Sequence, residues 1–224
     1  KRLVCLLLPL SLVAQDRPYG KIWATRSQVI AQHGMAATSH PLSTQVALDV
    51  LKAGGNAIDA AIAANAMEGV VEPHVNGIGG DLYAIVWDAK TKKLYGLNGS
   101  GRSPKSLSLA EFRKRGISHI PSQGPLPVTV PGCVDAWFEL HQKFGSMPMT
   151  QVLEKAVSYA KNGFPVHGEL ANSVKAVPAL YGSYPNIKKY YYPNGNVPLE
   201  GDVYKNPDLA NTLERIGKEG REVF

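Results

Sequence analysis

Cysteine is scarce in this sequence of 224 residues, which contains only two. Cys5 lies in the apolar start of the chain, so Cys133 stands alone in the remainder and no internal disulfide is expected. Neither cysteine has a histidine at a metal-ligand spacing, and His74 has no second ligand at such a spacing either. We therefore expect no metal site, and we interpret Cys133 as a core residue and His74 as a loop histidine whose polar atoms are satisfied.

The sequence also lacks the features of a nucleic-acid-binding surface. Lysine and arginine number 24 against 18 acidic residues, which gives a net charge of +6, but the cations are scattered along the chain. The densest basic group, Arg113–Arg115, lies beside Glu111 and has no interleaved aromatic residues on which bases could stack. We predict no nucleic-acid partner.

A nucleotide-binding loop is missing as well. The glycine cluster formed by Gly77, Gly79 and Gly80 follows a predicted helix and precedes a predicted strand, whereas a dinucleotide fingerprint needs strand, glycines and helix in that order. The sequence contains no Gly-Lys-Ser/Thr. The cluster is interpreted as an elbow in the main chain, where glycine permits close approaches that a side chain would forbid.

The apolar start of the chain is too short to cross a membrane. The run from Leu3 to Ala14 follows two cations and is typical of a signal peptide cleaved near Ala14 or Gln15. We predict a signal peptide at residues 1–14, a mature region at 15–224, and a periplasmic or secreted protein without a stable membrane span. A buried N-terminal strand is the alternative interpretation.

What the sequence does contain is a pair of helices followed by the glycine elbow. Residues 41–53 predict a helix that Ser39 or Ser43 could cap and that Gly54 ends. Residues 56–72 predict an alanine-rich helix that is apolar on every side. A helix of this kind is expected to be buried.

The elbow leads into a predicted hairpin. Residues 82–87 are apolar on both faces, which is typical of an interior strand, and the chain then turns back and ends on Arg102. Val128 and Val130 are expected to form an edge strand. Strands covered by helices on both faces indicate a layered α/β sandwich.

Three further helices are predicted in the second half of the chain. They begin near Pro131, at a cap formed by Thr150, and at Pro207. The run Tyr190–Tyr192 is interpreted as the packing of a long loop, with a ligand surface as the alternative.

Several of these segments together resemble the γ-glutamyltransferase family of the N-terminal-nucleophile hydrolase superfamily. The matching segments run from Gly34 to Asp88, over the NGSGRSP motif at 98–104, and from the VPGCVDAWFEL helix to Val166. The final NPDLANTLERIGKEG extends the match to residues 206–220, so the resemblance covers most of the chain after Gly34.

The resemblance implies an αββα sandwich that this chain forms only in part, residues 15–224 being the N-terminal part of a large subunit. It implies a proenzyme that cleaves itself, so that a new N-terminal threonine of the small subunit attacks a γ-glutamyl amide such as glutathione. An N-terminal nucleophile carries its own base in its α-amine, and no metal or other cofactor is needed. The threonine is expected beyond Phe224, so no catalytic residue is expected in this chain, which should be inactive alone.

Arg102 is the substrate-binding residue that the resemblance implies, since a guanidinium can bind the α-carboxylate of the substrate with two hydrogen bonds. In the transferases the arginine lies four residues before a proline, in the pattern R-E-x-A-P. Here Arg102 lies two residues before Pro104, Ser100 takes the matching place, and Asp81 replaces a glycine after the elbow. These departures resemble the acylase-like branch of the family.

Three functional hypotheses follow. The first is part of a γ-glutamyltransferase or hydrolase, whose partners are the small subunit and a γ-glutamyl substrate. The second is an acylase of the same fold, acting on cephalosporin-type or glutaryl amides. The third is a non-catalytic remnant that acts as a binding protein. The isolated segment should expose apolar residues of the sheet, namely Leu82, Ile85 and Val86, and aggregate.

Overall fold

The computed structural model describes residues 29–192 and 195–224. The chain divides into two compact units, Lys1–Gly34 and Met35–Phe224. In the first unit the described residues, 29–34, form no helix or strand. The predicted signal peptide at residues 1–14 lies outside the described residues, and the structure below is that of the second unit.

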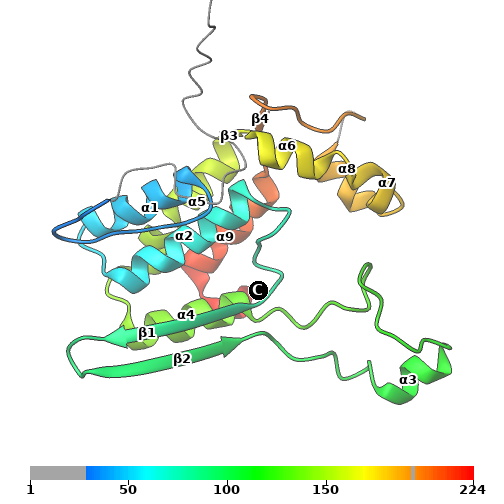
Figure 1. The fold of residues 1–224 in the computed structure, drawn as a ribbon, viewed down its shortest axis with the longest axis horizontal. Helices are drawn as coiled ribbons and strands as arrows, with labels where there is room; N and C mark the ends of the chain where they lie inside the picture. Colours follow the sequence, from blue (N-terminus) through cyan, green and yellow to red (C-terminus); the bar gives the residue numbers. More distant parts are fainter. Residues whose placement is uncertain (1–28, 193–194) are drawn as a thin grey trace, which may run out of the picture. The chain divides into compact units, whose positions relative to one another are not determined.

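The second unit is mainly helical and contains one well-formed β-hairpin (Figure 1). The longer helices are α1 (Pro41–Lys52), α2 (Ala57–Val71), α4 (Cys133–Phe144), α5 (Met149–Asn162) and α9 (Pro207–Glu219). The shorter ones are α3 (Leu109–Lys114), α6 (Gly168–Val174), α7 (Val177–Tyr181), α8 (Pro185–Tyr191) and the 3₁₀ turn η1 (Arg221–Val223). The strands are β1 (Leu82–Asp88), β2 (Lys93–Gly99), β3 (Phe164–Pro165) and β4 (Val203–Tyr204). No described helix is both long enough and apolar enough to cross a membrane.

Helix α2 lies at the centre of the helical layer. The Asn56 side chain and Asp59 cap its start reciprocally, which satisfies main-chain donors that the helix itself leaves unpaired. Of its 15 residues, 11 are buried, which confirms the prediction of a buried helix, although Ala57 and Ala61 leave one stripe near its start exposed. Its alanines let α1 and α5 pack closely against it.

Two predicted helix caps are wrong. The residue that caps α1 is His40, and neither Ser39 nor Ser43 does so. The His40 Nδ1 accepts a hydrogen bond from the Leu42 N–H at 3.1 Å. Helix α5 begins one residue before Thr150, after an N-cap Pro148 that forms no side-chain cap. A histidine ring nitrogen can accept the same N–H that a serine would, but histidine is outside the usual set of capping residues.

Helices α5 and α9 pack against each other along the layer. Helix α9 presents Ala210, Leu213 and Ile216 to the core, as its amphipathic pattern predicts. At Gly217 an added Cβ would lie 3.3 Å from the Thr150 Cα, so the glycine allows close approach of the two helices.

The β1–β2 hairpin packs on α4 with one face only. Its register pairs Tyr83 with Asn98, Ile85 with Gly96 and Trp87 with Leu94 on the outer face. Tyr83, Ile85 and Trp87 are 63%, 82% and 58% exposed. The prediction of a strand covered on both faces is therefore wrong for this unit, because none of the described residues forms a second layer over the outer face.

Two other expectations about the hairpin region are also wrong. Val128 and Val130 lie in a loop, although the Val130 N–H does bond to the Arg102 carbonyl oxygen at 2.9 Å. Ile85 is exposed as predicted, but Leu82 and Val86 are half-buried because they lie on the face toward α4. Their alternation along the strand, rather than their apolarity, decides which of them is exposed.

Candidate functional site

Arg102 lies just beyond the end of β2, where the chain leaves the hairpin. Its side chain is exposed and forms no ion pair with any described residue. It borders an open depression of about 760 Å³, lined by Asn98–Ser103, Lys105, Val130–Gly132 and Asp135. The Asp135 carboxylate is paired with Arg221 of η1, which leaves Arg102 as a cation available to an anionic ligand.

The main chain around Arg102 is held by close contact with the segment before α4. A Cβ at Gly101, which has φ of +76°, would lie 1.9 Å from the Val130 carbonyl oxygen. A Cβ at Gly132 would lie 2.2 Å from the Gly99 carbonyl oxygen. Both contacts exclude any side chain, so these glycines allow the Val130–Arg102 hydrogen bond that fixes the main chain at the candidate site.

The glycine elbow, residues 73–80, joins α2 to the same region. The Glu72 carbonyl oxygen at its start accepts hydrogen bonds from the N–H groups of Val75 and Asn76, both at 3.0 Å. At its end the Gly80 carbonyl oxygen accepts from the N–H groups of Gly132 and Cys133, at 3.0 and 3.1 Å. The elbow therefore supplies the cap that α4 lacks from its own side chains and ties α2 to the segment that holds Arg102.

The two other sequence candidates differ in outcome. Cys133 is 1% exposed, and its Sγ lies 3.6 Å from the Asn65 Oδ1. Burial, together with the nearby Asp81 carboxylate, raises the pKa of its thiol to about 12. It is a core residue, as predicted. The prediction of a satisfied His74 is wrong, because its Nδ1 is buried without a hydrogen-bond partner among the described residues. Across the same residues no group of three His, Cys, Asp or Glu side chains could hold a metal ion.

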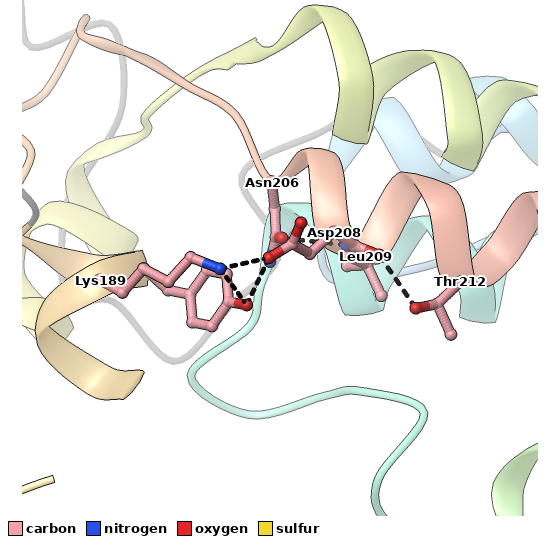
Figure 2. Close-up of polar contacts among 6 residues, drawn as sticks. Lys189, Asn206, Asp208, Leu209 and Thr212 are labelled. Atoms are coloured by element: carbon pink, nitrogen blue, oxygen red, sulfur yellow. Dashed lines mark hydrogen bonds and ion pairs between the residues drawn. The ribbon is translucent and has the colours of Figure 1, made fainter. Parts of the chain in front are cut away.

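The tyrosine run lies at the end of α8 rather than in a loop. Tyr190 and the neighbouring Lys189 donate hydrogen bonds to the Asp208 carboxylate, both at 2.6 Å (Figure 2). Asp208 lies in the first turn of α9, which Asn206 caps by accepting from the Leu209 N–H. These contacts join α8 to α9. They favour packing over a ligand surface as the role of the run.

A buried polar cluster was missed by the sequence analysis. Ser39, before α1, places its Oγ 3.0 Å from the Oε2 of Glu68, on α2, and 2.5 Å from the Oε2 of Glu72, the C-cap of α2. The His40 N–H donates to the Glu68 Oε1 at 3.3 Å, and the His40 ring meets the His167 ring edge-on with centroids 4.7 Å apart. Two carboxylates four residues apart on an otherwise apolar helix were the signal that could have revealed it.

The groups of this cluster affect one another's protonation. Burial, and the interaction with the neighbouring Glu72 carboxyl, raise the pKa of Glu68. The pKa of Glu72 is lowered by hydrogen bonds from Glu68 and Ser39, which outweigh the opposing effect of burial. Burial, assisted by the neighbouring His167, lowers the pKa of His40. The cluster lies at the end of α2 from which the elbow departs.

Comparison with known proteins identifies the family. The sequence profile of the gamma-glutamyltranspeptidase family matches residues 43–224. The chain is 36% identical over 197 residues to the glutathione hydrolase-like YwrD proenzyme of Bacillus subtilis (strain 168), covering 88% of this chain and 37% of that protein.

Solved structures agree. The cephalosporin acylase of Bacillus halodurans superposes with a TM-score of 0.83 at 41% identity, over 91% of this chain and 39% of that one. The gamma-glutamyltranspeptidase of Helicobacter pylori superposes with a TM-score of 0.81 at 30% identity, over 87% of this chain and 56% of that one.

These likenesses determine the fold as well as the family. The helices and the hairpin form part of the N-terminal-nucleophile hydrolase fold, as predicted. The chain spans 37% to 40% of the length of the first curated relatives that it matches. On the profile match over residues 43–224, this chain belongs to the gamma-glutamyltranspeptidase family.

Proposed function

We propose that the chain is the N-terminal part of a self-processing precursor that cleaves γ-glutamyl amides such as glutathione and transfers the glutamyl group to water, amino acids or peptides. The observation that carries this proposal is the placement of Arg102. Its main chain is fixed by the Val130 hydrogen bond and the glycine contacts, while its guanidinium faces an open depression. A guanidinium carried on a fixed main chain, with no ion pair to any described residue, suits a substrate carboxylate.

The nucleophile in this proposal comes from another part of the precursor. It is a threonine at the start of a small subunit, and its α-amine takes the proton of its hydroxyl when the hydroxyl attacks the amide carbonyl. The names of the similar proteins include proenzymes, which supports a processed precursor. The exposed outer face of the hairpin, with Tyr83, Ile85 and Trp87, is the surface that the small subunit would cover.

The protein is further proposed to act in the periplasm or outside the cell. The apolar run of residues 3–14 behind two cations supports this location.

The alternative function is that of an acylase on glutaryl or cephalosporin-type amides. It is favoured by Asp81 after the elbow, by the position of Arg102 two residues before Pro104, and by the 41% identity to an acylase. In this alternative Arg102 contacts the carboxylate of a different acyl group, or it contacts no substrate carboxylate.

Arg102→Lys in the full-length precursor tests the role of the arginine, and the substrate preference of the wild type separates the two functions. For a γ-glutamyl anilide we expect the KM to rise about 10- to 100-fold, because lysine keeps the charge but cannot form the two parallel bonds of a guanidinium. A glutaryl anilide keeps the carboxylate of the γ-glutamyl substrate and lacks only its α-amino group, so we expect a similar rise in KM for it wherever Arg102 contacts the acyl carboxylate. Arg113→Lys, an exposed cation on α3, is the matched control.

Steady-state kinetics of the three proteins on both substrates is the measurement. Unchanged kinetics of the Arg102 variant on the γ-glutamyl substrate would overturn the assigned role. A wild-type preference for the glutaryl substrate would instead favour the acylase.

A further inference from the structure

The buried cluster at the end of α2 has a proton count that its geometry determines. The Ser39 hydroxyl has one hydrogen, yet its oxygen lies within hydrogen-bond distance of two carboxyl groups, those of Glu68 and Glu72. If both carboxyls were ionised, the hydroxyl could donate to only one of them. The other would face the lone pairs of Ser39 and a second negative charge one helical turn away.

Placing one proton on the pair satisfies every contact. One carboxyl then donates its proton to the Ser39 Oγ, and the Ser39 hydroxyl donates to the other carboxylate. Among the described residues no lysine or arginine forms an ion pair with either glutamate, so a second charge on the pair has no ion-pair partner there. Ser39 is exposed, but Glu68 and Glu72 are only 7% and 8% exposed, so water has little access to their carboxyl groups.

We propose that Glu68, Ser39 and Glu72 share a single proton and that this proton positions the glycine elbow. The link to the elbow is direct, because the Glu72 carbonyl oxygen accepts the first two elbow hydrogen bonds, from Val75 and Asn76. The elbow also folds back on α2, where a Cβ at Gly69 would lie 3.3 Å from the Gly77 Cα. A change in the hydrogen bonds of the Glu72 side chain, at the end of α2, is therefore expected to change the position of the elbow.

The groups that face the pair come from three elements. The segment before α1 contributes Ser39 and the main-chain N–H of His40. The His40 ring lies against His167, the N-cap of α6, and both rings act electrostatically on Glu72. The His40 Nδ1 accepts from the Leu42 N–H, so this ring is neutral in the arrangement described.

The sign of the pH dependence follows from these groups. The pKa of Glu68 is raised, so its contribution to stability is present at low pH and is lost as pH rises through its folded pKa, above the usual 4.5. The pKa values of Glu72 and His40 are lowered, so their contributions are lost as pH falls through their folded pKa values. The pair therefore carries one proton at a pH between the folded pKa of Glu72, which lies below 4.5, and that of Glu68, which lies above it.

Hydrogen exchange of the full-length protein tests the proposal. One unit of pKa shift changes an equilibrium constant about tenfold. After correction for intrinsic rates, we expect local opening of peptides covering residues 70–81 to increase as pH rises above about 4.5, by about tenfold for each unit by which the pKa of Glu68 is raised. Glu68→Gln places a neutral donor at the same site, and we expect it to remove this increase.

Two more variants and one direct measurement complete the design. Glu72→Gln should also remove the increase, and the double variant should add nothing further, because both act on one shared proton. Glu154→Gln, an exposed carboxylate on α5, should keep the wild-type profile. Infrared spectroscopy of the wild type should show a protonated-carboxyl band that persists above pH 4.5 and that the Glu68 variant lacks.

Each result supports or overturns the shared proton. No protonated-carboxyl band in the wild type would overturn the proposal, even where a variant fails to fold. A wild-type pH profile in Glu68→Gln, or an equal loss in Glu154→Gln, would overturn the role in positioning the elbow. None of these readouts requires catalytic activity, so the result does not depend on the proposed function.

Discussion

The helical layer and the β1–β2 hairpin are both rich in apolar residues, yet they differ in how much of that surface is covered. In the helical layer the large side chains of Ile62, Met67 and Leu213 are at most 2% exposed. In the hairpin, Ile85 and Trp87 are 82% and 58% exposed. The comparison teaches that the layer formed by α1, α2, α5 and α9 completes its own core, whereas the hairpin completes only the face toward α4.

The largest expected effect comes from a core substitution in the helical layer. Leu213→Ala on α9 should lower the free energy of unfolding by about 2–5 kcal/mol, because it leaves a cavity between α9 and α5. Ile85→Ala on the outer face of the hairpin should change it by about 0.5 kcal/mol or less. Denaturant unfolding of residues 15–224 measures both, and equal losses would contradict the difference between the two regions.

The second prediction concerns the contact that fixes the main chain at Arg102. Gly101→Ala should cost about 1–3 kcal/mol, because its φ is positive and its Cβ would overlap the Val130 carbonyl oxygen. Gly96→Ala, in open space on the same strand pair, should change stability by about 0.5 kcal/mol or less. Thermal unfolding of the two variants measures the difference, and similar values would mean that the contact at Gly101 relaxes at no cost.

The smallest expected effect on stability comes from changing the outer face to a polar one. Ile85→Lys should alter the free energy of unfolding of residues 15–224 by about 0.5 kcal/mol or less, while reducing aggregation seen by light scattering. In the full-length precursor the same change should cost more, because the proposed second layer would bury the new charge. A similar cost in both proteins would contradict a covered outer face.

Periodicity predicted the elements of the helical layer well. The all-round apolarity of residues 56–72 requires burial, and the spacing of Ala210, Leu213 and Ile216 predicts the face that packs, because a helix repeats every 3.6 residues. The caps were harder, since His40 satisfies α1 through a ring nitrogen that no capping preference indicates.

The candidate site was predicted in part. Arg102 was found through the family resemblance, and its place at the end of β2 followed from the hairpin pattern. The contacts of Gly101 and Gly132 were not foreseen, because they join segments that are 30 residues apart. The Glu68–Ser39–Glu72 cluster escaped for the same reason, since Ser39 precedes α1 whereas the two glutamates lie at the end of α2 and at its C-cap.

The sequence by itself determined the family, the identity of the main helices and the hairpin, and the choice of Arg102, because these depend on residue type and on spacing along the chain. Only the tertiary structure decided which face of β1 is exposed, what fixes the main chain of Arg102, and that two glutamates share one serine hydroxyl. Those features depend on which surfaces meet in space. An apolar strand has the same sequence pattern whether one or both of its faces are covered.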